Sequence, residues 1–258
     1  MKTNKNRSRF KLLIATLVLT KFIILLGVLV AWKQIGLSAH THSVIDEHEE
    51  GISAPSQSSG IQGADVSHYQ EKIRWAKLDE NSNIEFVFIK ATEGISMVDH
   101  RFNANWKDAN KTNLICGAYH FFLPNISVKQ QFQNYKRKVV LKKGNLVPLL
   151  DVERDQGLNQ NELNKRIKQW LNLAEAHYGV KPLIYTTQRF YNTYLKNRFD
   201  EYEFVIARYN TKRPYMLDAR KVKFWQYTDR GRLPGISGNV DRQNFSGGKK
   251  DLMKYTLE

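Results

Sequence analysis

LVPLLDVE, residues Leu146–Glu153, is an apolar run of strand type that ends in two carboxylates, Asp151 and Glu153. Successive side chains in a strand point to opposite faces, so these two acids project from one face, with Cα atoms about 7 Å apart. Two acids on one face at the end of a buried strand are costly unless they are paired or used. The pair suits glycosidic bond cleavage, which needs a protonated carboxyl and a second carboxylate nearby. The alternative is a strand that runs into a solvated acidic loop, and Arg154 and Asp155 fit that alternative.

From residue 61 onward, apolar runs of strand type alternate with helical segments. Such alternation predicts parallel strands joined by crossover helices. About six strands of this kind, followed by two with little helix, predict an α/β fold. This fold is an irregular (β/α) TIM-like barrel of about eight strands whose last strands lack helices. The strands are expected at 61–67, 85–92, 114–122, 146–153, 182–187, 204–209, 221–228 and 239–245, and the helices at 73–78, 102–113, 128–143, 159–178 and 190–199.

Polar residues gather at the expected ends of these strands, which is where a β/α barrel carries its chemistry. Each also has an ordinary explanation, since a tyrosine or tryptophan can simply pack in the barrel and an aspartate can cap a turn. Tyr119 and His120 alternate, so only one of them can face the interior, and we expect it to be Tyr119. Acids delivered to one rim by separate strands favour a catalytic site. The candidates are Asp65, Lys90, Tyr119, Asp151, Glu153, Tyr185, Tyr209, Trp225, Gln226 and Asp241.

Residues 1–39 have the pattern of a targeting segment. A flank with five cations precedes an apolar stretch from Leu12 to Trp32, which is long enough to span a bilayer as a helix although Lys21 interrupts it. The basic flank is expected to stay in the cytoplasm, which places the rest of the chain outside. Leu37 would occupy the −3 position of a cleavage site after Ala39, where a small residue is preferred. An uncleaved signal anchor is therefore favoured over a cleaved signal peptide.

Residues 40–60 have the composition of a flexible linker, with four acids followed by SAPSQSSG and no apolar periodicity. The remaining residues, 61–258, are expected to form the barrel domain. The chain contains one cysteine, Cys116, which excludes a disulfide framework within the chain and any multi-cysteine metal site.

The formal net charge is +15. Residues 1–39 supply seven of the positive charges and the linker four negative ones, so the domain from residue 61 onward carries +12. A basic domain implies anionic partners. Nucleic acid would require exposure to the cytoplasm, which the N-terminal pattern contradicts. An anionic cell-wall polymer outside the membrane is the partner that fits both observations.

Eight motifs, in order along the chain, resemble glycoside hydrolase family 25, the Chalaropsis-type lysozymes or N-acetylmuramidases. The resemblance covers residues 61–245, nearly the whole of the expected soluble part. The motifs are GADVSHYQ (63–70), FVFIKATEG (86–94), GAYHFF (117–122), PLLDVE (148–153), LIYTT (183–187), FVIARY (204–209), FWQYT (224–228) and NVDRQNF (239–245).

The resemblance implies an irregular β/α barrel that hydrolyses the β-1,4 bond between N-acetylmuramic acid and N-acetylglucosamine in peptidoglycan. By this resemblance, Asp65 matches the family's aspartate on the first strand, and Asp151 and Glu153 match its pair of acids. Asp241 matches the family's aspartate on the last strand. Residues that match the family's sugar-lining positions are Lys90, Tyr119 and Tyr185. No metal or organic cofactor is implied, and the catalytic domain is expected to be monomeric. The sequence shows no wall-binding repeats after the barrel, and many relatives are freely secreted rather than anchored.

Two other functions compete with this one. The first is a non-catalytic, membrane-tethered wall-binding module on a degenerate barrel, although a degenerate site would be free to lose its acids and all four are present. The second is a glycosidase for a related polymer such as chitin. Chitinases of the β/α type usually carry a longer run of alternating acids than Asp151 and Glu153 provide.

Overall fold

The computed structural model describes residues 60–209 and 212–258. The expected targeting segment, and the expected linker except for Gly60, lie outside these residues. Within the described part of the chain, no helix is both long enough and apolar enough to cross a bilayer.

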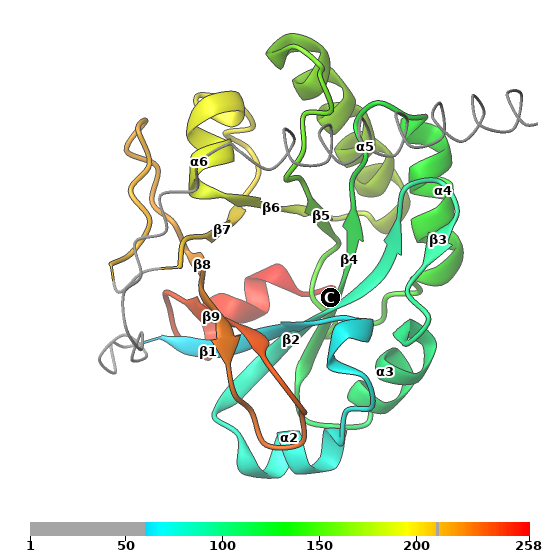
Figure 1. The fold of residues 1–258 in the computed structure, drawn as a ribbon, viewed down its shortest axis with the longest axis vertical. Coiled ribbons are helices and arrows are strands. Elements are labelled where there is room, and N and C mark those ends of the chain that lie inside the picture. The colour runs from blue at the N-terminus through cyan, green and yellow to red at the C-terminus, as the bar shows by residue number, and fades with distance from the viewer. Residues whose placement is uncertain (1–59, 210–211) are drawn as a thin grey trace, which may run out of the picture. The chain divides into compact units, whose positions relative to one another are not determined.

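Eight strands close into a barrel, with one further short strand outside the ring (Figure 1). Their bounds are β1 (Ile61–Val66), β2 (Ile84–Glu93), β3 (Met97–Val98), β4 (Ile115–Phe121), β5 (Leu149–Asp151), β6 (Leu183–Thr187), β7 (Phe204–Ala207), β8 (Phe224–Gly231) and β9 (Val240–Phe245). The ring runs β1-β2-β4-β5-β6-β7-β8-β9 and closes by pairing β9 with β1, while β3 pairs only with the end of β2. The predicted barrel of about eight strands is confirmed.

β9 is the exception to the parallel order in the ring, because it pairs antiparallel with both β8 and β1. The loop 232–239 that precedes it is too short for the crossover that a parallel connection requires. The chain therefore turns back. As a result Asp241, near the start of β9, lies beside Asp65, near the end of β1.

Helices cover the outside of the barrel along its first strands. They are α2 (Trp75–Asn81), α3 (Phe102–Ala109), α4 (Val128–Lys138), α5 (Gln160–Tyr178) and α6 (Gln188–Phe190), which continues into the π-helical turn η2 (Tyr191–Leu195). Figure 1 shows α3, α4 and α5 around the side formed by β2, β4 and β5. No helix lies between β8 and β9 in the described residues, as the sequence predicted. The C-terminal elements α7 (Lys249–Leu252) and η3 (Met253–Tyr255) were not predicted.

Local sequence explains where the longest helix, α5, begins and ends. Asn159 caps α5 at its N-terminus by accepting a hydrogen bond from the Glu162 amide at 3.0 Å. Gly179 ends the helix in the left-handed conformation, with φ of 71°. Between them Leu163, Ile167 and Trp170 are fully buried against the barrel. This spacing is the amphipathic pattern seen in the sequence.

The apolar side chains form two layers, one between the strands and the helices and one inside the barrel. Phe86 and Phe88 on β2 fill the barrel interior. Two glycines on the neighbouring strands make room for these rings. A Cβ on Gly63 would overlap Phe86, and one on Gly117 would lie 2.7 Å from Phe88. Glycine at both positions is thus a packing requirement.

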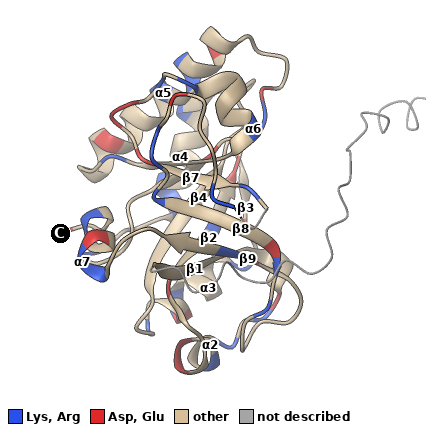
Figure 2. Cartoon of the chain, turned by 90° about the vertical axis from the view of Figure 1, so that its left-hand side faces the viewer, with Lys and Arg blue, Asp and Glu red and all other residues tan. Residues whose placement is uncertain are grey.

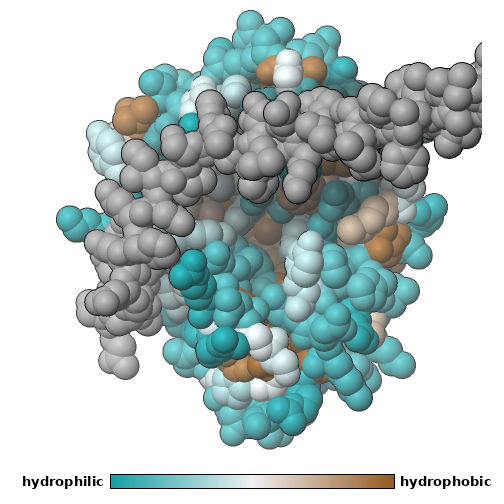
Figure 3. Space-filling model, in the orientation of Figure 1, coloured by the Kyte–Doolittle hydropathy of each residue, from teal (hydrophilic) through white to brown (hydrophobic). Residues whose placement is uncertain are grey.

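The surface is polar and of mixed charge. Lys and Arg are interspersed with Asp and Glu along α2, α5 and α7 (Figure 2). On the uncovered part of the face drawn in Figure 3, hydrophilic residues predominate and apolar ones form small separate spots. Nothing on that part of the face resembles a broad apolar docking surface.

Candidate active site

A pocket of about 660 Å³ opens at the rim where the parallel strands end. Its floor is built from strand residues and its walls from the loops that follow them. A pocket of this size can enclose a small organic ligand or part of a polymer. The lining residues are Asp65, Val66, Ser67, Tyr69, Gln70, Lys90, Tyr119, Phe121, Leu149, Asp151, Glu153, Tyr185, Tyr209, Gln226, Asp229, Gly238, Asn239 and Asp241.

Asp151 and Glu153 both line this pocket, as the strand alternation predicted. Asp151 is the last residue of β5 and pairs in register with Phe121 on one side and Tyr185 on the other. Between the two acids, Val152 points into the apolar layer under the helices. Asp151 is buried and Glu153 is half-buried, so the pair spans the depth of the site.

Asp65 and Asp241 face the same pocket from the antiparallel pair β1 and β9. Two amides hold one oxygen of the buried Asp65. Gln226 Nε2 donates to Asp65 Oδ2 at 2.7 Å, and Gln243 Nε2 donates to it at 2.6 Å. The other oxygen, Oδ1, is buried without a hydrogen-bond partner among the described residues, and so is Oδ1 of Asp151. Unpartnered carboxyl oxygens in a pocket are groups that a ligand can satisfy.

The pKa values of Asp65, Asp151, Glu153 and Asp241 are raised, and burial is the first cause in each case. Burial and the nearby Asp241 charge raise the pKa of Asp65 to about 8, although its two amide partners act in the opposite direction. Burial and the Asp229 charge raise the pKa of Asp241 to about 6. Burial and the Glu153 charge hold the pKa of Asp151 well above its ordinary value. Burial also raises the pKa of Glu153. With a pKa of about 8, the Asp65 carboxyl is mainly protonated at neutral pH.

Lys90 places a positive charge among these acids. Its ammonium group lies 2.7 Å from Glu93 Oε2, and its side chain is nearly buried. It favours the charged forms of both Asp151 and Glu153 and so limits how far burial raises their pKa values. Lys90 thus balances the acidic pair as well as lining the pocket.

Three tyrosines predicted for the site, Tyr119, Tyr185 and Tyr209, line the pocket. Tyr119 faces inward as predicted. His120 is fully buried on the opposite side, where its ring stacks on Trp170 with centroids 5.8 Å apart.

Gln226 links the tyrosines to the first aspartate. Tyr185 and Tyr209 donate their hydroxyl hydrogens to Gln226 Oε1, at 2.8 and 3.1 Å. The opposite end of the same amide holds Asp65. Gln226, expected to bind substrate, therefore also orients Asp65.

The structure does not bring Trp225 into the pocket. It is next to Gln226 on β8, so its side chain points to the other face of the strand. The indole is buried and donates from Nε1 to the Arg208 carbonyl at 2.9 Å. Trp225 is not among the residues that line the pocket.

Gln243 and Tyr69 are among the site residues that the sequence did not predict. Gln243 lies two positions after Asp241 on β9, so strand parity placed it on the same face and was the signal available. Tyr69 follows β1 in the turn η1 (His68–Gln70), and its exposure at the pocket edge had no signature in the sequence.

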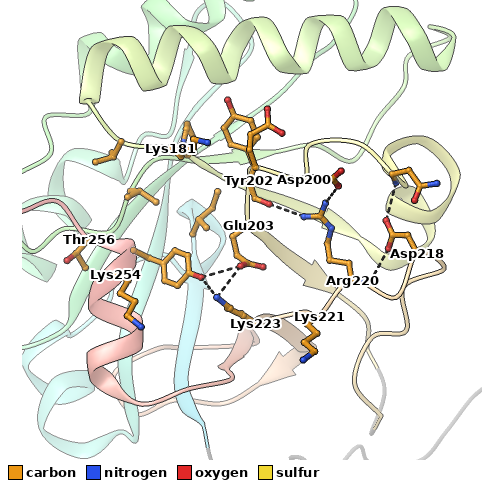
Figure 4. Close-up of a pocket in the computed structure, with 17 residues that line it drawn as sticks. Lys181, Asp200, Tyr202, Glu203, Asp218, Arg220, Lys221, Lys223, Lys254 and Thr256 are labelled. Carbon is orange, nitrogen blue, oxygen red and sulfur yellow. Dashed lines mark hydrogen bonds and ion pairs between the residues drawn. The ribbon is translucent and has the colours of Figure 1, made fainter.

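A second cavity of about 870 Å³ lies at the other end of the barrel, where the strands begin (Figure 4). Four of its charged lining residues form two ion pairs. Arg220 Nη2 lies 2.7 Å from Asp200 Oδ1, and Lys223 Nζ lies 3.5 Å from Glu203 Oε2 and 2.8 Å from the Tyr255 hydroxyl. None of the five acids of the first pocket lines this cavity. Within residues 60–209 and 212–258, no cluster of three or more His, Cys, Asp or Glu side chains is suited to hold a metal ion.

Comparison with known proteins yields one family. The sequence model of glycosyl hydrolases family 25 matches residues 64–236, so Asp241 lies just beyond the match. The YegX protein of Escherichia coli K12 is 40% identical over 199 residues, which span 76% of this chain and 73% of YegX. Lysozyme M1 of Streptomyces globisporus is 32% identical over 223 residues, which span 80% of this chain and 74% of that lysozyme. A solved family 25 glycosyl hydrolase from Bacillus anthracis superposes with a TM-score of 0.74 at 34% identity, covering 81% of this chain and 100% of that one.

Proposed function

The chain belongs to glycosyl hydrolases family 25, and on this premise we propose that it is a lysozyme that hydrolyses the β-1,4 bond between N-acetylmuramic acid and N-acetylglucosamine in peptidoglycan. The observation that carries the proposal is the Asp151–Glu153 pair at the barrel rim, inside a pocket shared with Asp65 and Asp241. The matched lysozyme from Streptomyces supports the same substrate class.

We assign Glu153 as the general acid that protonates the leaving-group oxygen. Burial raises its pKa, which favours the protonated form that a general acid needs, and its half-buried position lets it meet a sugar oxygen at the pocket opening. Asp151 lies deeper, where burial and the Glu153 charge favour its protonated form. A hydrogen bond from the substrate to Asp151 would stabilise its charged form and leave the shared proton on Glu153.

The substrate carries a 2-acetamido group, which can act as the nucleophile while Asp151 polarises it. Substrate assistance is an established variant of the two-carboxylate scheme, and it retains the anomeric configuration. Asp65 and Asp241 complete an acidic site that favours positive charge developing on the sugar ring. Lys90, Tyr119, Tyr185, Tyr209 and Gln226 line the groove and are proposed to contact the glycan.

Hydrolysis of purified peptidoglycan tests the proposal, with analysis of which sugar bears the new reducing end. New N-acetylmuramic acid ends are expected. New N-acetylglucosamine ends would identify a different glycosidase. Binding to walls without any new ends would identify a non-catalytic wall-binding module.

We also propose that the chain is exported and stays attached to the membrane through residues 12–32, with the catalytic domain outside the cytoplasm. The support is the cationic flank before an apolar stretch long enough to span a bilayer. The full-length protein should sediment with membranes and resist extraction by salt. A soluble form that begins near His40 would show cleavage, which would overturn the anchor but not the export.

A further inference from the structure

Tyr69 is an exposed aromatic residue at the edge of the candidate active site. It lines the pocket, yet 78% of its surface is exposed, the highest value among the large hydrophobic residues that the structure shows as exposed. Its hydroxyl makes no hydrogen bond to any described residue, and its only ring contact is with His68, at 4.2 Å between centroids. Neither the core nor the hydrogen-bond network therefore explains a tyrosine here.

The turn that carries Tyr69 is held rigidly. Ser67 and Gln70 form a capping box: the Tyr69 amide donates to Ser67 Oγ at 3.2 Å, and the Ser67 amide donates to Gln70 Oε1 at 2.8 Å. Gln70 Nε2 then donates to the Asn239 carbonyl at 3.0 Å, which ties the turn to the loop before β9.

The residue before Tyr69 is anchored as well. Both the backbone amide and Nδ1 of His68 contact Oδ2 of the buried Asp99, at 3.0 and 2.7 Å. The backbone on each side of Tyr69 is fixed, while its own side chain projects outward. Such a ring loses little conformational freedom when a ligand settles on it, which is the advantage of tyrosine at binding surfaces.

Because Tyr69 is exposed at the edge of the pocket, it lies away from the buried acids at the floor. The buried Asp65 and Asp151 form the floor of the pocket, so a sugar in contact with them occupies its depth. A sugar ring that stacks on the exposed face of Tyr69 is therefore a different one, further along the glycan strand. Aromatic faces are apolar surfaces on which the apolar face of a sugar ring can pack.

We propose that Tyr69 forms an outer glycan subsite, stacking on a sugar ring beyond the two that flank the cleaved bond. This inference rests on the proposed function, since it takes the ligand of the pocket to be a peptidoglycan strand. It deepens that function by making binding depend on chain length: a strand that reaches Tyr69 binds more tightly than one that fills only the floor.

Binding of glycan strands of graded length to the Glu153→Gln protein tests the subsite without turnover. Adding Tyr69→Ala should weaken binding of long strands about tenfold relative to the shortest strands, the scale of one stacking contact. Tyr69→Trp should restore the long-strand preference, because it keeps an aromatic face. Tyr215→Ala is the matched control, since Tyr215 is 66% exposed but does not line the pocket. It should leave the length dependence unchanged.

The outcomes separate this inference from the proposed function. If the Glu153→Gln protein binds strands and Tyr69→Ala changes nothing, the subsite is overturned and the lysozyme assignment stands. Equal weakening at every length would place Tyr69 at the cleaved bond, which also overturns an outer subsite. Failure to bind strands of any length, together with no hydrolysis by the wild-type protein, would overturn both.

Discussion

Glu153 and Asp151 are two residues apart, but their surroundings differ. Asp151 ends a strand and is buried, whereas Glu153 lies just beyond the strand and is half-buried. Burial raises the pKa of each, and the charge of Glu153 raises that of Asp151 further. The two carboxyls therefore titrate as a coupled pair, and substrate contacts decide which of them carries the proton during the reaction.

Glu153→Gln should reduce turnover by at least about a hundredfold, because an amide cannot donate the proton that a general acid supplies. Thermal unfolding should change little, since Gln has the same shape. Initial rates on purified peptidoglycan and a melting curve measure both effects. Glu80→Gln, at an exposed position on α2, is the control and should be as active as wild type. A folded Glu153→Gln protein with wild-type activity would remove Glu153 from the mechanism.

Asp65 should leave a signature in the pH dependence of stability. Its pKa is about 8 in the folded protein, against an ordinary value of 3.8. A raised pKa in an acid means that its contribution to stability is complete below about pH 4 and is lost as pH rises toward about 8. Asp65→Asn removes this titration, and its amide oxygen can still accept from Gln226 and Gln243.

Between pH 5 and pH 8, wild type should therefore lose stability relative to Asp65→Asn. Melting temperatures of both proteins across this range measure the difference. The other three acids titrate in both proteins, so they largely cancel in the comparison. Parallel curves would show that Asp65 is ionised in the folded protein throughout this range.

At the scale of elements, the sequence located every strand of the ring but not every strand end. β5 was expected over residues 146–153 and forms a ladder only over Leu149–Asp151. Before it, the Leu146 amide donates to Cys116 and the Val147 amide donates to Tyr255 in the C-terminal turn. Pro148 has no amide hydrogen to donate. The apolar pattern of a sequence predicts which residues are buried. It does not predict that a segment distant in the sequence will accept their backbone hydrogen bonds.

The candidate site was predictable to a similar degree. Nine of the ten predicted residues line the pocket, because the carboxyl ends of parallel strands meet at one rim. Strand parity allows only one of Trp225 and Gln226 to face the pocket, but it does not say which of them does. The missed contact of Gln243 depends on the antiparallel pairing of β9, a tertiary fact that β9 alone does not encode.

Gly117→Ala tests the packing inside the barrel. The added methyl group would lie 2.7 Å from the Phe88 ring and 2.9 Å from Leu146 Cβ, so the neighbouring residues must shift. Overpacking of this kind costs about 1–3 kcal/mol of the free energy of unfolding. Gly248→Ala is the control, because a Cβ there meets nothing within 4 Å and φ is −87°. Chemical denaturation should show the loss for Gly117→Ala alone, and equal midpoints for the two variants would contradict the packing role.

At the scale of the molecule, an acidic pocket lies in a basic domain. The four acids line one cavity, whereas the domain from residue 61 onward carries a net charge of +12. Along α2, α5 and α7, Lys and Arg are spread among Asp and Glu (Figure 2), whereas α4 carries Lys129, Lys136, Arg137 and Lys138 and no acid. The excess positive charge, part of it concentrated on α4, creates a field suited to holding a large anionic polymer near the pocket.

Salt should weaken binding to intact walls more than cleavage of short fragments. The Debye length falls from about 14 Å at 0.05 M salt to about 4 Å at 0.5 M, which screens the attraction between a basic surface and a distant polymer. Short soluble muropeptide chains lie mainly within the pocket, where contacts are closer and less exposed, so their cleavage should respond much less. Sedimentation with walls and initial rates on fragments, measured over the same salt series, compare the two. Equal sensitivity would mean that the basic surface does not hold the wall, and the positive charge would then serve solubility alone.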